Sequence, residues 1–166
     1  MRPWTTSRAR YVCPVKAEIL LANTEDQARA DIDALLRSAG WLLQDRDELA
    51  LGAGQGIAVR EFPLKSGFAD YLLYVNRQPV GAIEAKKAGT PLSGVEWQAE
   101  KYSTGLPDEL PAPRRPLPFL YESTGKETYF TNGFDPDPRS RPIFAFYHPE
   151  TLVVDHTGRR GNEVSL

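Results

Sequence analysis

Apolar and polar positions along the chain predict a helix near the start and a sheet after it. Between Thr24 and Gly40, apolar residues recur at helical spacing, namely Ala28, Ile32, Leu35, Leu36 and Ala39. Thr24 is the expected N-cap, with Gln27 at the capping-box position, and Gly40 is the expected C-cap. Residues 1–15 show no clear period and are expected to be irregular or a short strand.

Six short segments that are mostly apolar predict β-strands, which glycines, prolines and polar turns separate. They are residues 57–62, 69–75, 80–86, 119–122, 128–131 and 143–147. The second and third flank a polar turn at 76–79 and predict a hairpin. Residues 95–104 favour a helix, and the five prolines of residues 106–118 exclude regular structure there. This order predicts an α/β (α+β) fold, with a mixed central β-sheet flanked by helices.

Length and composition narrow the class of protein. The 166 residues suit one domain, expected over residues 1–154 with a core at about 23–152. From Asp155 onward the chain is polar, which predicts a frayed tail or the start of a linker. A single cysteine suits a reducing cytoplasm, and no apolar run reaches the roughly 18 residues that span a membrane. The net charge of −2 argues weakly against a nucleic-acid partner.

Charged residues interrupt the predicted hairpin at 69–86. Side chains alternate along a strand, so Glu84 and Lys86 share one face while Ile83 and Ala85 point to the other. Asp70 begins the first strand and is expected opposite or diagonal to Glu84. Two converging carboxylates repel unless a cation separates them, and hard oxygen ligands suit Mg²⁺ or Mn²⁺. With a lysine to hold a water, these residues are the minimum set for metal-dependent phosphodiester hydrolysis.

Other interpretations of these charges stay open at this point. Charged residues are common at strand ends, so Glu84 and Lys86 also fit a solvated edge or a simple ion pair. A phosphate-binding loop around Ser123-Thr-Gly-Lys126 is excluded. Leu120 stands where its first glycine should be, and Glu127 stands where a Ser or Thr should be.

Several further segments accompany this pattern. Gln98 and Tyr102 have the spacing of a QxxxY motif, and the segment His148-Pro-Glu-Thr-Leu152 follows near the end. In this order the sequence resembles the N-terminal nuclease domain of the restriction (R) subunit of type I restriction-modification enzymes, which are PD-(D/E)xK nucleases. The resemblance covers roughly residues 23 to 152. Ala69 replaces the proline of the family motif.

The resemblance implies roles for the hairpin residues. Asp70 matches the first catalytic acid, and Glu84 and Lys86 match the ExK motif. The carboxylates of Asp70 and Glu84, with the backbone carbonyl of Ala85, would hold Mg²⁺, with Mn²⁺ as a possible substitute.

The resemblance also implies supporting residues outside the hairpin. Gln98 and Tyr102 would position the DNA backbone or the metal-site carboxylates from one helix face. Glu25 matches an acid that completes the metal site in many such enzymes. A first-turn acid that favours the helix dipole is an equally open alternative for Glu25.

The implied function is cleavage of double-stranded DNA, with methyltransferase and specificity subunits as partners and without a membrane. ATP would act only in a motor region, of which this sequence shows no Walker motif. Two alternatives stay open: a DNA-binding or assembly module of the same complex that does not cut, and a stand-alone DNA repair nuclease.

Overall fold

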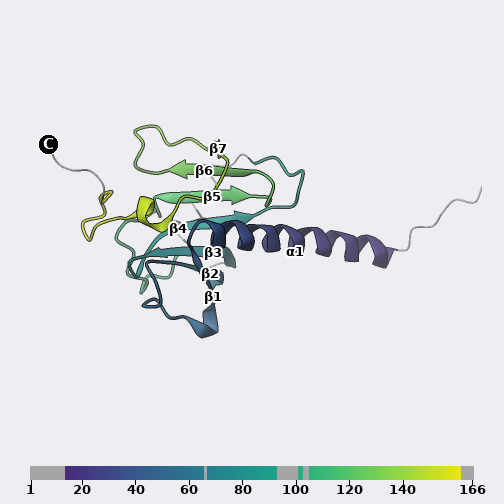
Figure 1. Ribbon diagram of the computed structural model, residues 1–166, viewed down its shortest axis with the longest axis horizontal. Helices are drawn as coiled ribbons and strands as arrows, with labels where there is room; N and C mark the ends of the chain where they lie inside the picture. The colour runs from purple at the N-terminus through teal and green to yellow at the C-terminus, as the bar shows by residue number, and fades with distance from the viewer. Residues whose placement is uncertain (1–13, 66, 93–100, 103–104, 162–166) are drawn as a thin grey trace, which may run out of the picture.

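A computed structural model of the chain describes residues 14–65, 67–92, 101–102 and 105–161, with side chains from residue 25 onward. A long helix lies along one face of a mixed seven-stranded sheet (Figure 1). The predicted α/β class is therefore confirmed. The elements are α1 (Pro14–Ser38), β1 (Leu42–Asp45), η1 (Arg46–Glu48), β2 (Gly56–Pro63), β3 (Phe68–Val75), β4 (Gln78–Ala85), β5 (Phe119–Ser123), β6 (Thr128–Asn132), β7 (Arg141–Ile143) and η2 (Pro149–Leu152).

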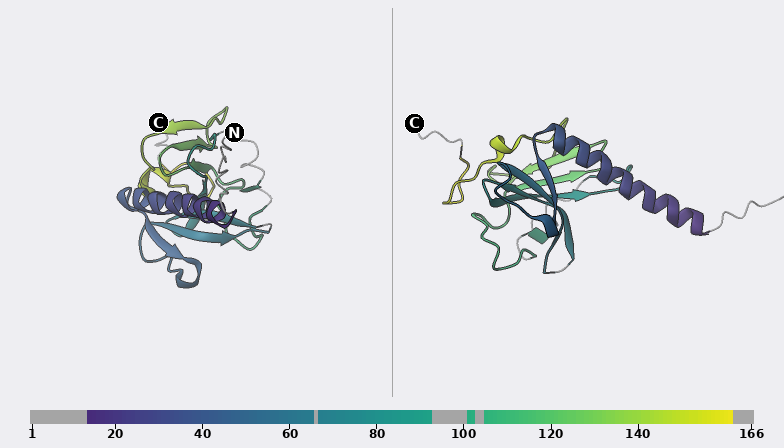
Figure 2. Two further views of the ribbon diagram at one scale, coloured as in Figure 1. Left: turned by 90° about the vertical axis from the view of Figure 1, so that its right-hand side faces the viewer. Right: turned by 60° about the horizontal axis from the view of Figure 1, so that its bottom comes forward.

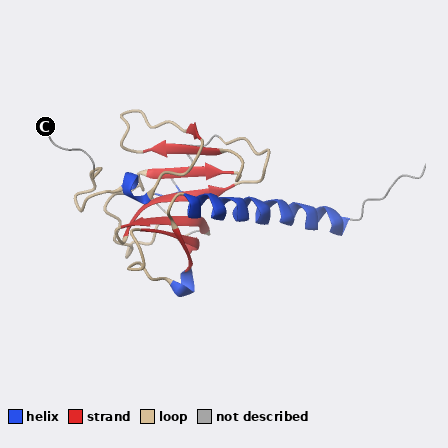
Figure 3. Cartoon of the chain, viewed as in Figure 1, coloured by secondary structure: helices blue, strands red, loops and turns tan. Residues whose placement is uncertain are grey.

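The strands lie in the sheet in the same order as in the chain. β2, β3 and β4 form an antiparallel meander, and β5, β6 and β7 form a second one. β4 and β5 pair in parallel at the centre, so the chain between them has to cross over the sheet. Among the described residues, α1 is the only long helix, and η1 and η2 lie at the margins of the sheet (Figure 3).

Helix α1 begins at Pro14, well before the predicted N-cap Thr24. The predicted start was wrong because residues 15–22 contain no glycine or further proline, and a proline fits the first helical position. Gln27 donates to Asp31 one turn later in the helix. The predicted end is confirmed, since Gly40 has a φ of +85° just after the helix. The first half of α1 projects beyond the sheet (Figures 1 and 2).

Apolar residues are buried on both faces of the sheet. On the α1 face, Ile32 and Leu36 pack in a cluster with Tyr71, Leu73 and Ile83. The other face is covered by the chain that follows residue 100, and there the buried residues include Leu72, Ala82, Tyr102, Leu106 and Leu117. The nearly continuous apolar run of β3 is thus buried on both sides, as predicted.

Several predicted boundaries need correction. β1 was not predicted, because its four residues are too few to show alternation. The last strand is β7 at Arg141–Ile143, and residues 144–147 are outside it. Of the predicted helix at 95–104, only residues 101 and 102 are described as helical, and residues 95–100 and 103–104 lie outside the described residues.

The segment after β7 and η2 is more ordered than predicted. Val154 and Arg160 form an isolated β-bridge, and Asp155 Oδ1 accepts hydrogen bonds from the backbone N–H groups of Thr157 and Arg159. The frayed tail predicted from Asp155 onward is therefore not found as far as Gly161. A linker in this segment stays a prediction. No helix among the described residues is both long and apolar enough to cross a membrane.

Gly81 permits the close approach of β4 and β5. A Cβ atom there would lie 2.4 Å from the backbone carbonyl oxygen of Phe119, which cannot move without breaking the sheet. We predict that Gly81→Ala lowers the free energy of unfolding by about 1–3 kcal/mol, measured by urea denaturation. As a control, Gly54→Ala would meet only the side-chain end of Leu42, which can move, so its cost should be smaller. Equal stabilities for the two variants would contradict this packing argument.

Candidate active site

A hairpin with a bulge positions the predicted site. Asn76 and Arg77 form its turn with φ values of 50° and 68°, between paired Val75 and Gln78. The register then shifts by one residue, because Tyr74 pairs with Pro79 whereas Leu73 pairs with Gly81. Val80 is the extra residue of this bulge.

The bulge decides which residue faces Asp70. Beyond it, Tyr71 pairs with Ile83, and the same register places Asp70 opposite Glu84. Without the extra residue, Ile83 would be opposite Asp70 and Glu84 would lie on the other face. Asp70 Oδ2 also accepts a hydrogen bond of 2.9 Å from the backbone N–H of Ala85. The structure therefore brings the two carboxylates together at the end of the hairpin, as predicted.

Three side chains hold the carboxylate of Glu84. Lys101 Nζ lies 2.7 Å from Oε2, the Tyr102 hydroxyl donates to the same oxygen at 3.0 Å, and Lys86 Nζ lies 3.3 Å from Oε1. Only 13% of the Glu84 side chain is exposed, which contradicts the solvated-edge alternative. Burial alone raises the pKa of Glu84. The hydrogen bond and charge of Lys101, together with Lys86 and Tyr102, outweigh it and hold that pKa below the usual range.

Asp70 is held by the helix on the opposite side. Arg29 donates from one terminal nitrogen to Asp70 Oδ1 at 2.9 Å, and its other terminal nitrogen lies 3.3 Å from Glu61 Oε1. The Asp70 side chain is 18% exposed. Burial lowers the pKa of Arg29, but the charge and hydrogen bond of Asp70, with Glu61, produce a net increase. The ion pair of Asp70 is therefore made by Arg29, which was not among the residues predicted for the site.

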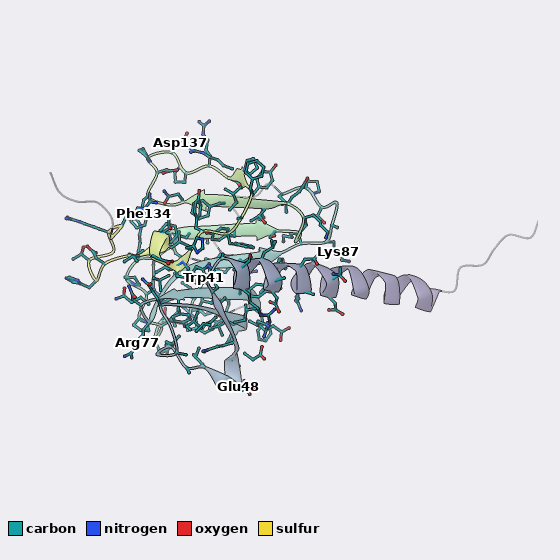
Figure 4. All side chains as sticks on the ribbon, in the orientation of Figure 1. Trp41, Glu48, Arg77, Lys87, Phe134 and Asp137 are labelled. Atoms are coloured by element: carbon teal, nitrogen blue, oxygen red, sulfur yellow. The ribbon has the colours of Figure 1, made fainter. Side chains whose placement is uncertain are left out.

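Arg29, Asp70, Glu84 and Lys86 line an open pocket of about 390 Å³, and Glu25 and Lys87 are also part of its lining. Glu25 lies within α1, far from its first turn, so the helix-dipole alternative for this residue is wrong. Its carboxylate lies 3.5 Å from Lys87 Nζ. Figure 4 shows Lys87 beside α1. The structure thus places Glu25 at the edge of the pocket that holds Asp70 and Glu84.

The predicted residues are not all described. Gln98 lies outside the described residues, and its role stays a prediction. Tyr102 is buried at the site, where its hydroxyl contacts the Glu84 carboxylate. Arg29 and Lys101 were missed, although each had a sequence signal: Arg29 lies one turn after Glu25, and Lys101 precedes Tyr102.

The donor set is compatible with a hard divalent cation. The carboxylates of Asp70 and Glu84 line the pocket, and Ala85 is also part of its lining. Within the described ranges, no group of three or more His, Cys, Asp or Glu residues is arranged to hold a metal. Oxygen-only donors favour Mg²⁺ or Mn²⁺ over zinc.

Comparison with known proteins places the chain in the class of restriction-enzyme subunits. Residues 50–153, more than half of the chain, match the family described as the type I restriction enzyme EcoKI endonuclease subunit second domain. The chain belongs to this family, and the predicted resemblance to type I restriction subunits is confirmed. Helix α1, with Glu25 and Arg29, precedes the matched residues.

A relative of known identity also belongs to the type I restriction enzymes. The type I restriction enzyme EcoKI endonuclease subunit of Escherichia coli (strain K12) is 36% identical over 91 residues, which make up 48% of this chain. The matched region is 8% of that subunit, so this chain corresponds to a small part of it. No solved structure matches the chain significantly.

The ion pairs of Glu84 predict a pH dependence. Because its pKa is lowered in the folded state, the pairs stabilise the fold above the usual glutamate pKa of about 4.3. That contribution is lost as the pH falls through the lower, folded pKa. Lys101→Met should raise the pKa of Glu84, measured by ¹³C NMR of its carboxyl group, and should weaken the acid dependence of stability. Lys126→Met, which removes an exposed lysine paired with Asp31, should leave the Glu84 titration unchanged. An unchanged titration in Lys101→Met would contradict the assigned contact.

Proposed function

We propose that this domain hydrolyses phosphodiester bonds of double-stranded DNA with Mg²⁺ or Mn²⁺, as the nuclease domain of a type I restriction R subunit. The observation that carries the proposal is the register that sets Asp70 opposite Glu84, with Lys86 next to them on the rim of an open pocket. Membership of a restriction endonuclease subunit family supports a role of this site in restriction.

Asp70, Glu84 and the Ala85 carbonyl would hold the metal ion, and Glu25 is a further candidate ligand at the pocket edge. When bound, such an ion neutralises charge on the phosphate and lowers the pKa of a bound water. Both carboxylates are mostly buried, so water screens their attraction for a cation only weakly.

The other side chains would position the reacting groups. Lys86 is partly exposed, lines the pocket and lies close to Glu84 Oε1, so its ammonium group can hold a water or a phosphate oxygen. Tyr102 and Lys101 fix Glu84 Oε2, and the Ala85 N–H fixes Asp70 Oδ2. Gln98 would act beside Tyr102 as the other half of the QxxxY motif. Preorganised groups of this kind lose little energy in reorganisation during the reaction.

The proposal also includes the cellular location and the partners of the domain. We expect the domain to act in the cytoplasm with methyltransferase and specificity subunits, and with an ATP-driven motor encoded outside this sequence. The relative that matches is described as an endonuclease subunit, of which this chain covers a small part.

One observation favours a second function, that of a DNA-binding or assembly module that does not cut. All four carboxylate oxygens of Asp70 and Glu84 already accept contacts from protein groups: Arg29, the Ala85 N–H, Lys86, and Lys101 with Tyr102. A site satisfied in this way could persist without a metal ion.

A cleavage assay separates the two functions. We predict that Asp70→Ala, Glu84→Ala and Lys86→Ala each reduce nicking of supercoiled plasmid in Mg²⁺ by about 100-fold or more, because each removes a group that acts on the reacting phosphate. Glu127→Ala, which removes an exposed acid in the β5–β6 turn, should cut normally. Circular dichroism checks that each variant is folded.

The assay includes the chain alone and the chain joined to the motor region and assembled with the partner subunits and ATP. Normal cleavage by all three variants would contradict the site assignment. If the wild-type protein cuts in neither form but still shifts duplex DNA on a gel, the module function is supported instead.

A further inference from the structure

We infer that Arg29 is an exchangeable counter-ion of Asp70: it yields Asp70 Oδ1 to a divalent cation and then binds a DNA phosphate. The inference rests on the proposed function and deepens it by coupling metal binding to DNA binding. It concerns helix α1, which lies outside the residues that match the family.

The contacts of Arg29 bridge two acids. One terminal nitrogen is 2.9 Å from Asp70 Oδ1, and the other is 3.3 Å from Glu61 Oε1. The side chain is 43% exposed, and it lines both the pocket of about 390 Å³ and a neighbouring pocket of about 490 Å³. A guanidinium group at this position can leave Asp70 without crossing packed protein.

Glu61 provides a second position for the same guanidinium. The β2–β3 register pairs Arg60 with Tyr71 and Phe62 with Ala69, which puts Glu61 opposite Asp70. Facing like charges destabilise a sheet unless a cation bridges them. Glu61 also has a φ of 48°, in the left-handed region that glutamate rarely adopts. Glu61 contacts the terminal nitrogen of Arg29 that does not contact Asp70, so this contact can remain after Asp70 is released.

Glu84 Oε2 lacks this freedom, and Lys86 on Glu84 Oε1 is 30% exposed against 43% for Arg29, so Asp70 has the more exposed charged partner. Lys101 is only 17% exposed and Tyr102 is buried, so the groups on Glu84 Oε2 are held inside the protein. The other oxygen of Asp70 is fixed by the Ala85 N–H. Asp70 Oδ1 is therefore the carboxylate oxygen at this site whose partner is both charged and half exposed.

The charges at the site link metal binding to DNA binding. The charges of Arg29, Lys86 and Lys101 balance those of Asp70, Glu84 and Glu61, and Lys87 pairs with Glu25. An entering divalent cation therefore creates an excess of positive charge. A DNA phosphate would compensate that excess, and arginine is well suited to bind it in a bidentate manner. By linkage, the metal and the DNA then strengthen each other's binding by the same factor.

Calorimetric titration of MnCl₂ into the purified chain without DNA tests the competition. Arg29→Ala should bind Mn²⁺ about fivefold to tenfold more tightly than the wild type, because the competing cation is gone. Arg29→Lys keeps the charge and should bind nearly as the wild type does. The control is Arg37→Ala, which removes an exposed arginine of the same helix that lies 3.9 Å from Asp33. It should change Mn²⁺ affinity by less than about twofold, since its ion pair is exposed and distant from Asp70.

A second titration tests the coupling to DNA. Ca²⁺, used so that cleavage is avoided, should strengthen binding of a short duplex to the wild type, and Arg29→Ala should lose most of this strengthening. If the wild type binds Mn²⁺ and Arg29→Ala binds it equally or more weakly, the inference is wrong while the proposed metal site stands. If neither protein binds Mn²⁺, both the metal site and the inference are overturned. Thermal melts confirm that each variant is folded.

Discussion

Two acidic side chains facing each other at a mostly buried sheet end are the constraint on which the rest of the site depends. Asp70 and Glu84 are like charges on paired strands, and because both are mostly buried, each needs compensation that water cannot fully supply. The protein provides it from both layers around the sheet, with Arg29 from α1 on one side and Lys101 on the other. Tertiary packing thus holds the pair in place before any ligand takes part.

The position of the pair depends on local backbone geometry. The two-residue turn of the hairpin and the extra residue Val80 together set which face Glu84 occupies. Gly81, next to the bulge, lets β5 approach closely enough to complete the central parallel pair. A small change in this turn would exchange Glu84 for Ile83 opposite Asp70. The chemistry of the site is therefore encoded as much in the hairpin as in its charged residues.

Much of the hairpin could be predicted from the sequence, because alternation and turn residues are local signals. The two strands and the approach of Asp70 to Glu84 follow from them, whereas the bulge at Val80 that sets Asp70 directly opposite Glu84 does not. The start of α1 could not be found this way, since Thr24 carries a capping signal that the longer helix overrides. Arg29 and Lys101 lie close in sequence to Glu25 and Tyr102, but their contacts with Asp70 and Glu84 depend on how distant segments pack. The function of Gln98 stays a prediction.

The central claim is that Asp70 and Glu84 form a divalent-cation site. Its most direct test is a crystal of the protein soaked in MnCl₂, with diffraction measured where manganese scatters anomalously. The account predicts an anomalous peak about 2.0–2.3 Å from one oxygen of each carboxylate, with Arg29 displaced from Asp70. A peak elsewhere, or no peak at a saturating Mn²⁺ concentration with Arg29 still bound to Asp70, would contradict it.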